Sequence, residues 1–145
     1  MRYVKSILAA LCLCAGAATL TSCEDKIEVQ QVYDFALQTM PVQSEIKLGE
    51  TAEIRCQLLK NGDYDDAKFT IRYFQPDGEG ELRMDDGTLF LPNDRYPLDR
   101  EEFRLYYTSN CTDAQTIDIY IEDNFGLISV SNFTFNNESV DDAIE

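Results

Sequence analysis

The amino-acid sequence predicts an all-β protein whose one domain is a β-sandwich of seven to nine strands. Two observations carry this prediction: apolar and polar residues alternate in several short segments, and turn-forming residues separate these segments every 8–12 residues or so. A single sheet would leave many of these apolar faces in water, whereas two facing sheets bury them against each other. No segment shows the apolar period of a three-turn helix.

Five segments are strand-like. In the clearest one, Ile117, Ile119 and Ile121 share one parity, and charged or ring-bearing residues lie between them. This period of two is typical of a half-buried strand. The five segments are residues 52–58, 69–73, 103–107, 117–121 and 127–135, the last being rich in β-branched and aromatic residues. Four weaker segments follow the same pattern: residues 33–39, 44–48, 81–84 and 88–91.

Turn residues separate these segments. Gly49 precedes the first clear strand, and residues 60–63 end it with Lys-Asn-Gly-Asp. Pro-Asp-Gly at 76–78 closes the next strand, and Asp-Asp-Gly at 85–87 divides an expected hairpin. Gly126 joins the last two strands and is free to adopt positive φ.

The first residues read as an export signal. Arg2 and Lys5 precede an uncharged apolar run at residues 7–18, which is shorter than the ~20 residues that cross a bilayer. The next residues, Leu20-Thr21-Ser22-Cys23, resemble the bacterial lipobox. That resemblance implies cleavage before Cys23 and lipidation of its sulfur, with two or three acyl chains giving a firm membrane anchor. An ordinary signal peptide that ends near a cysteine is the alternative.

The expected domain organisation follows from this cleavage. Residues 1–22 are the lipoprotein signal peptide, and their removal from the 145 residues leaves 123, which fits one domain. Residues 23–32 form a lipidated tether, residues 33–137 the sandwich and residues 138–145 an acidic tail. The predicted location is the cell envelope, anchored to the outer membrane on its periplasmic face or at the cell surface.

The chain is strongly acidic, with a formal charge of −15. The signal segment holds two basic residues and no acidic one, so the remaining ten basic and 27 acidic residues give −17. Phosphate neutralisation needs a basic patch, so this balance argues against direct binding of nucleic acid. It suits a well-solvated domain, or one that meets a basic protein partner.

Catalysis is not expected. The sequence has no histidine, which removes the commonest general base and the commonest metal ligand. A serine or cysteine nucleophile would lack its usual partner. The carboxylates fall in turns and on outward-facing strand positions, where a solvated surface is the default. The sequence therefore predicts a protein that is not an enzyme and has no cofactor besides the covalent lipid on Cys23.

Calcium is the one metal that the acidic loops suggest, because it prefers hard oxygen ligands. Residues 98–101, Leu-Asp-Arg-Glu, match a calcium motif of cadherins, but the companion Asp-x-Asn-Asp-Asn pattern is absent. The alternative is acidic loops in which Arg100 forms a surface ion pair. The weak candidate ligands are Asp63, Asp65, Asp66, Asp99 and Glu101.

Two cysteines remain in the domain once Cys23 is lipidated. Cys56 lies on the inward parity of its strand, and Cys111 precedes the strand at residues 117–121. Exported proteins can keep disulfides, and a bridge closing this loop of about 55 residues would contribute roughly 4 kcal/mol in the chain-entropy model. Two thiols that never meet are the alternative.

The closing segment, residues 116–135, resembles the last hairpin of bacterial immunoglobulin-like domains, although the chain has no tryptophan. The whole mature chain resembles a known family, the TraQ conjugal-transfer lipoproteins of Bacteroides-type conjugative transposons. The segments that carry this resemblance are Leu20-Thr21-Ser22-Cys23-Glu24, Tyr33-Asp34-Phe35, Lys47-Leu48-Gly49-Glu50-Thr51, residues 72–78 with Gly80, Tyr106-Tyr107-Thr108 and Asp123-Asn124-Phe125-Gly126. The resemblance implies an immunoglobulin-like fold and a part in the DNA-transfer apparatus; Cys23 alone carries over as a functional residue.

Two functions therefore stay open. The first is a structural or accessory component of a conjugative DNA-transfer apparatus that contacts other envelope proteins through a sandwich face or an edge strand. The second is a surface adhesin or glycan-binding module, with or without calcium. Aromatic residues in excess of the inward positions, such as Tyr106, Tyr120 and Phe125, would serve either by stacking on sugars or by anchoring a protein.

Overall fold

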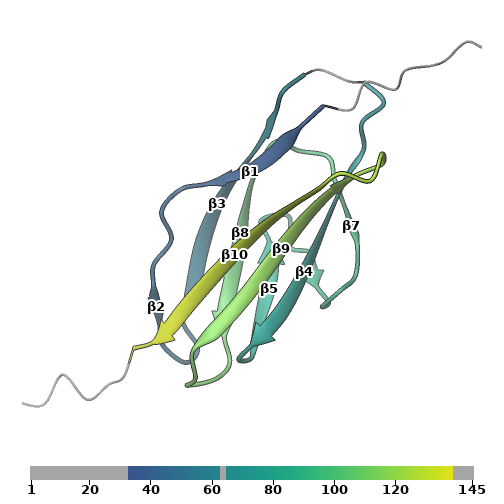
Figure 1. Cartoon of the computed structure of the whole chain (residues 1–145). Coiled ribbons are helices and arrows are strands. Elements are labelled where there is room, and N and C mark those ends of the chain that lie inside the picture. Colours follow the sequence, from purple (N-terminus) through teal and green to yellow (C-terminus); the bar gives the residue numbers. More distant parts are fainter. Residues whose placement is uncertain (1–32, 63–64, 139–145) are drawn as a thin grey trace, which may run out of the picture. The chain divides into compact units, whose positions relative to one another are not determined.

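A computed structural model describes residues 33–62 and 65–138 of the chain. These residues form ten strands and no helix (Figure 1). The strands are β1 (Phe35–Thr39), β2 (Glu45–Ile46), β3 (Thr51–Lys60), β4 (Phe69–Asp77), β5 (Gly80–Met84), β6 (Leu89–Phe90), β7 (Tyr96–Leu98), β8 (Glu102–Ser109), β9 (Gln115–Asp123) and β10 (Ile128–Asn137). Accordingly, this part of the chain offers no helix that is long and apolar enough to span a membrane. The signal segment, Cys23, the tether and most of the acidic tail lie outside the described residues.

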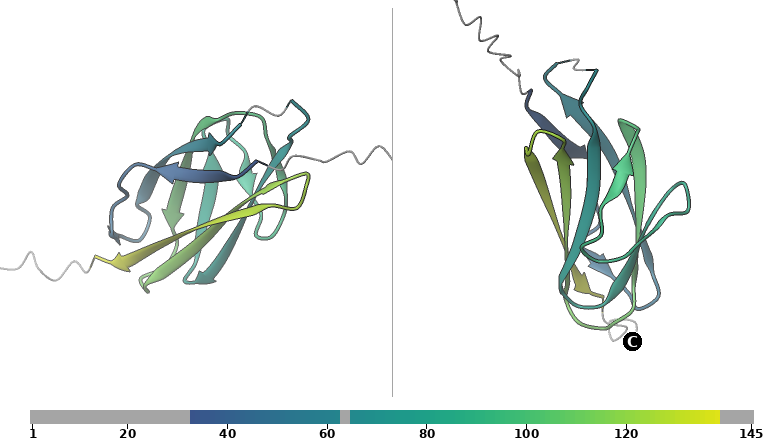
Figure 2. Two further views of the ribbon diagram at one scale, coloured as in Figure 1. Left: turned by 45° about the horizontal axis from the view of Figure 1, so that its top comes forward. Right: turned by 90° about the vertical axis from the view of Figure 1, so that its right-hand side faces the viewer.

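The strands form two five-stranded sheets that face each other, as Figure 2 shows from the side. Sheet one has the order β1-β3-β8-β5-β6, and sheet two has the order β2-β10-β9-β4-β7. All neighbours are antiparallel except β2 and β10, which are parallel. This is an immunoglobulin-like arrangement, in which β1 joins sheet one through β3 and the next strand, β2, joins sheet two through β10. The predicted all-β sandwich is confirmed.

The core consists of the inward-facing residues of both sheets. The alternation seen in the sequence becomes alternation of burial: Ile54 in β3, Leu105 in β8 and Ile119 in β9 are fully buried, while their chain neighbours are not. Burying such side chains stabilises the fold by about 1.5–3 kcal/mol each. The nine segments expected from the sequence correspond to nine of the strands, and β7 is an additional one.

Strand β7 was not predicted because Pro97 sits at its centre. Proline cannot donate a hydrogen bond to a ladder, so a proline normally argues against a strand. Here β7 is the edge of sheet two and pairs on one side only, with β4, where Pro97 faces Thr70. The missing N–H of Pro97 therefore removes no hydrogen bond from the sheet, and the neighbouring Leu98 is buried in the core.

A polar network is buried at the end of the sandwich where β9 begins. The Tyr107 hydroxyl donates to Oε1 of Gln115 at 2.6 Å, and Nε2 of Gln115 donates to the Ser109 hydroxyl at 2.6 Å. Nε2 of Gln75 donates to the Tyr107 oxygen at 2.9 Å. The Tyr107 ring stacks on Phe135 with 5.3 Å between ring centroids, which joins the two sheets. Oε1 of Gln75 is buried without a hydrogen-bond partner among the described residues, and the hydrogen bonds that do form favour one arrangement of the sheets.

Candidate protein-binding surfaces

The outer face of sheet two carries a cluster of rings around an arginine. Strand alternation directs Arg72 and Phe74 of β4 and Tyr120 of β9 to this face. The Arg72 guanidinium lies 5.2 Å from the Phe74 ring centroid and 5.1 Å from that of Tyr120. Its Nη2 atom lies 2.6 Å from Glu122, and Arg95 contacts the same carboxylate at 2.8 Å. Two guanidinium groups thus share the one carboxylate of Glu122, while Nε of Arg72 has no hydrogen-bond partner among the described residues.

Strand β10 adds solvent-exposed apolar side chains to the outer face of sheet two. Ile128 is 55% exposed and Val130 is 54% exposed. Both lie on the outward parity of β10, opposite Glu122 and Tyr120 of β9. Large apolar side chains exposed side by side on a sheet are typical of an interaction site when other observations support one. Strand β10 also pairs with β2 only at Asn136 and Asn137, and no other strand among the described residues pairs with this second side.

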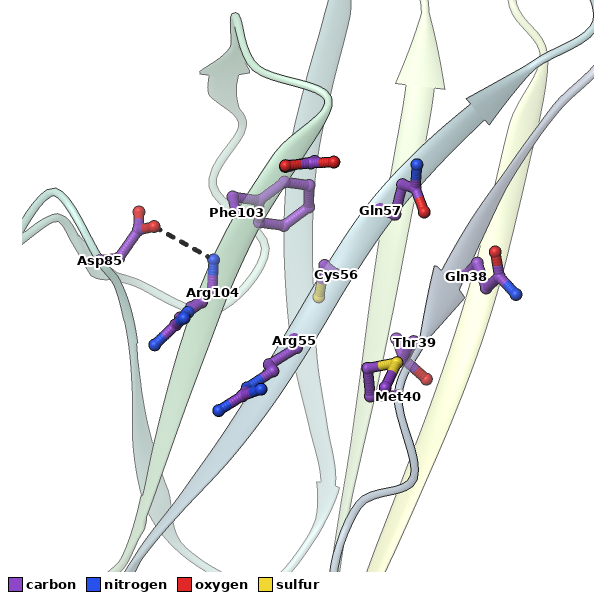
Figure 3. A pocket seen from close by; sticks show the side chains of 10 residues that line it. Gln38, Thr39, Met40, Arg55, Cys56, Gln57, Asp85, Phe103 and Arg104 are labelled. Atoms are coloured by element: carbon purple, nitrogen blue, oxygen red, sulfur yellow. Dashed lines mark hydrogen bonds between the residues drawn. The ribbon is translucent and has the colours of Figure 1, made fainter.

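A shallow depression of about 390 Å³ lies on the outer face of sheet one (Figure 3). Arg55 of β3 and Arg104 of β8 face each other across the ladder, an arrangement that repels unless a carboxylate intervenes. Glu53 provides that carboxylate, because it accepts from Arg55 Nε at 3.2 Å and lies 3.0 Å from Arg104 Nη1. Gln38 and Gln57 supply further polar groups around this depression.

The turn between β5 and β6 borders the depression. Asp85 accepts the backbone N–H of Arg104 at 3.2 Å and pairs with the Arg100 guanidinium. This ion pair raises the pKa of Arg100 above its usual value. In the same turn the backbone N–H of Thr88 donates to Asp86 and lowers the pKa of that carboxyl. Carboxylates and guanidinium groups pair with each other here, so the depression is lined largely by paired polar groups.

The two domain cysteines do not meet, and the suggested bridge is not formed: both are free thiols. Cys56 lies opposite Phe103 near the start of β8, whereas Cys111 follows the end of β8 and accepts the backbone N–H of Glu79 at 3.2 Å. Phe103 and Cys111 are eight residues apart, and the part of that step inside β8, from Phe103 to Ser109, spans roughly 20 Å in an extended strand. A disulfide requires Cα atoms within about 7 Å. Burial raises the pKa of the Cys56 thiol to about 12, with the Asp85 charge adding to it.

The calcium candidates are not brought together either. Asp63 lies outside the described residues, and residues 33–62 and 65–138 contain no cluster of three acidic, cysteine or histidine side chains arranged to hold a metal ion. Glu101 instead lies 2.7 Å from Lys60 Nζ. The predicted ion pair of Arg100 does form, with Asp85 as its partner.

The aromatic residues in the described part of the chain are buried or partly buried. Tyr73 and Tyr107 are buried in the core, and Tyr96 packs edge-on against Phe90 at 4.9 Å. Tyr106 and Tyr120 do lie on outward faces, as expected, yet both are half-buried. Within the described part of the chain the large side chains left in water are aliphatic. The open side of β10 was not identified from the sequence, although residues 124–137 form a conspicuous uncharged run.

Comparison with known proteins places the chain in a family. The family model of the TraQ conjugal transfer protein matches residues 6–138. A search of curated proteins gave no match. Three solved structures are similar to this chain. A conjugative transposon lipoprotein from Bacteroides eggerthii is 49% identical, and the match covers 73% of this chain and 100% of that one with a TM-score of 0.69. For a lipoprotein from Bacteroides thetaiotaomicron the identity is 55%, the coverage 81% and 91% and the TM-score 0.68, and for a conjugate transposon protein from Bacteroides vulgatus the identity is 43%, the coverage 83% and 98% and the TM-score 0.65.

The match extends over the strands, the buried network and both outer faces described above. The relatives are covered almost in full and share the sandwich, so the comparison is between whole domains. The resemblance inferred from the sequence is thereby confirmed, and membership of this family supports a role in conjugal transfer. The chain belongs to the TraQ conjugal transfer family.

Proposed function

We propose that this chain is a lipid-anchored, non-enzymatic accessory component of the DNA-transfer apparatus of a conjugative transposon. It acts through contacts with other proteins of the cell envelope. The observation that carries the proposal is the family match over residues 6–138, together with relatives that are named conjugative transposon proteins or lipoproteins.

The lipid anchor in this proposal is Cys23. It follows Leu20-Thr21-Ser22 at the end of an apolar leader, the order in which an exported lipoprotein is cut and acylated. The similar structures from B. eggerthii and B. thetaiotaomicron are described as lipoproteins, which supports the same anchor here. The anchor would hold the domain at the outer membrane, on its periplasmic face or at the cell surface.

A role through protein contacts fits the chemistry of the surface. The chain has no histidine, and each outer face has a carboxylate paired with arginine, Glu53 with Arg104 and Glu122 with Arg72. Such paired charges set the register and the specificity of a docked protein more than its affinity. The strong negative charge keeps the domain off DNA and favours partners with basic surfaces.

Gene replacement in a donor strain tests this function. The gene is deleted and restored as the intact chain, as Cys23→Ala and as Cys111→Ala, the last being a control at a cysteine that receives no lipid. We expect the deletion and Cys23→Ala to lower the mating frequency, because the domain is absent or leaves the membrane, while Cys111→Ala transfers normally. Normal transfer from the deletion strain would refute the proposed function.

A further inference from the structure

The side of β10 that faces away from β9 has backbone groups with which no strand in residues 33–62 and 65–138 pairs. The N–H of Asn136 donates to Ser44 at 2.8 Å and that of Glu138 to Ile46 at 3.1 Å, so even-numbered residues here direct their N–H away from β9. Because both backbone groups of a residue in an antiparallel ladder point to the same side, Val130, Asn132 and Thr134 present N–H and C=O to this open side. No described strand pairs with them there.

Three of the four strands at the ends of the two sheets are very short, and the fourth, β1, has five residues without proline or charge. Strand β7 has three residues with Pro97 at its centre, and β2 and β6 have two residues each. Short edges, prolines and charges are the devices that keep edge strands from pairing with other chains. Strand β10 has ten residues and contains neither proline nor a charged residue. Its open side is therefore suited to accept another strand.

A groove accompanies this edge. The connection from β1 to β2 passes beside the second half of β10, where the chain moves from sheet one to sheet two (Figure 1). A depression of about 400 Å³ lies between them, lined by residues 39–44 and 132–135, none of which is charged. Met40, at its rim, is 60% exposed. An extended peptide on the edge would place its side chains against this uncharged groove.

The charge pattern indicates what kind of segment fits. The edge is uncharged along its length and acidic at both ends. Asp34 and Asp123 lie together near its start, and Glu45 and Glu138 lie near its end, where Lys47 is 3.7 Å from Glu138. A second copy paired antiparallel would bring acidic end to acidic end, on top of a formal charge of −15 per chain. A segment with basic residues on either side of an uncharged centre is complementary.

We infer that the open edge of β10 binds an extended segment of another envelope protein, uncharged at its centre and flanked by lysine or arginine. The segment adds a strand to sheet two by main-chain hydrogen bonds, in the manner of β-augmentation. This inference rests on the proposed function, since it names the surface and the partner chemistry by which the lipoprotein contacts the apparatus.

Substitution at Val130 tests the edge without touching the β9–β10 ladder. Val130→Pro removes an N–H that points to the open side, as Pro97 does in β7, whereas Val130→Ala removes the exposed side chain and keeps the N–H. Both variants are compared as full-length chains whose abundance and protease resistance match the wild type. Val130→Pro is then expected to lower the mating frequency about tenfold, because one or two hydrogen bonds to the partner segment are lost. Val130→Ala is expected to stay near wild type.

The outcomes separate the two proposals. Equal transfer by Val130→Pro and Val130→Ala, in a background where deletion abolishes transfer, overturns the edge inference and leaves the proposed function standing. Normal transfer after deletion overturns the proposed function itself, and the inference is then judged by cross-linking.

Cross-linking identifies the occupant independently of folding effects at Val130. A photoreactive residue is placed at Thr134 beside the groove, or at Arg83 on the outer face of β5 as a control, in the full-length lipoprotein of cells that carry the transfer genes. We expect an adduct from position 134 alone, joined to a segment of another protein with the stated charge pattern. An adduct with a second copy of this chain, or no adduct from position 134, would overturn the inference.

Discussion

The Tyr107 hydroxyl lies 2.6 Å from Oε1 of Gln115, and both side chains are completely buried. Tyr107 belongs to β8 in sheet one and Gln115 begins β9 in sheet two, so this hydrogen bond joins the two layers. Gln115 continues the connection to Ser109, whose hydroxyl donates to the Cys111 carbonyl at 2.9 Å. The bond thus holds the β8–β9 connection against the core and makes several mutations informative.

Removing the hydroxyl should destabilise the domain. Tyr107→Phe leaves Oε1 of Gln115 buried without its donor, which costs about 1–3 kcal/mol of the free energy of unfolding. Tyr106→Phe, one residue earlier on the outer face, is the matched control and should change this free energy by less than about 0.5 kcal/mol. Urea unfolding measures both. Equal stability of the two variants would show that the buried bond does not stabilise the fold.

Gly80 is the position where added volume should matter most. A Cβ atom there would lie 2.3 Å from the Tyr107 hydroxyl oxygen, so Gly80→Ala must displace a ring that already stacks on Phe135. Overpacking of this kind costs about 1–3 kcal/mol. Glu79→Ala, at the exposed neighbouring position, is the control for thermal unfolding. A midpoint for Gly80→Ala at or above that of the wild type would contradict this packing.

The domain should lose stability in alkaline solution. Desolvation raises the pKa of Tyr107 from 10.0 to about 12 and that of Cys56 from 9.0 to about 12. Both groups are neutral when protonated, and the unfolded chain releases their protons at lower pH than the folded one. These two groups should therefore leave the free energy of unfolding unchanged between neutral pH and about pH 8, and lower it as the pH rises towards 12. The decline should be smaller in a Tyr107→Phe, Cys56→Ala double variant; an equal decline would exclude these groups as its cause.

The two domain thiols should differ in reactivity. Cys56 is 5% exposed with a raised pKa, so a thiol reagent at pH 8 should leave it unmodified in the folded protein. Cys111 is partly exposed in the β8–β9 connection and should react without denaturant. Peptide mapping after labelling distinguishes them, with a denatured sample as the control. A disulfide between them in the oxidised protein would contradict the placement of both strands.

Local pattern predicted most of the fold because each half-buried strand repeats with period two. The alternation through Ile117, Ile119 and Ile121 becomes alternating burial without exception, and the same holds for β3 and β8. Strand β7 was missed because of Pro97. A proline is tolerated in an edge strand but not in a central one, and the sequence pattern does not show which strand lies at an edge. The separation of Cys56 from Cys111 was equally beyond local pattern, because it depends on register along β8.

The candidate surfaces were harder to predict than the fold. Sequence alone placed Tyr106 and Tyr120 outward but could not show that neighbouring side chains half-cover them. The open side of β10 arises because β2 pairs with only two of its residues, Asn136 and Asn137. Strand β2 is this short because the chain crosses from sheet one to sheet two just before it, and the sequence of residues 40–44 did not predict where that crossing occurs.

Contact with the transfer apparatus is the central claim, and cross-linking in donor cells tests it most directly. The full-length lipoprotein is cross-linked in its own envelope, purified under denaturing conditions, and its adducts are identified by mass spectrometry. The account predicts adducts with proteins encoded by the same transfer genes, and the loss of these adducts in a Cys23→Ala chain that is not anchored. Abundant lipoprotein in the envelope without any adduct to a transfer protein would contradict it.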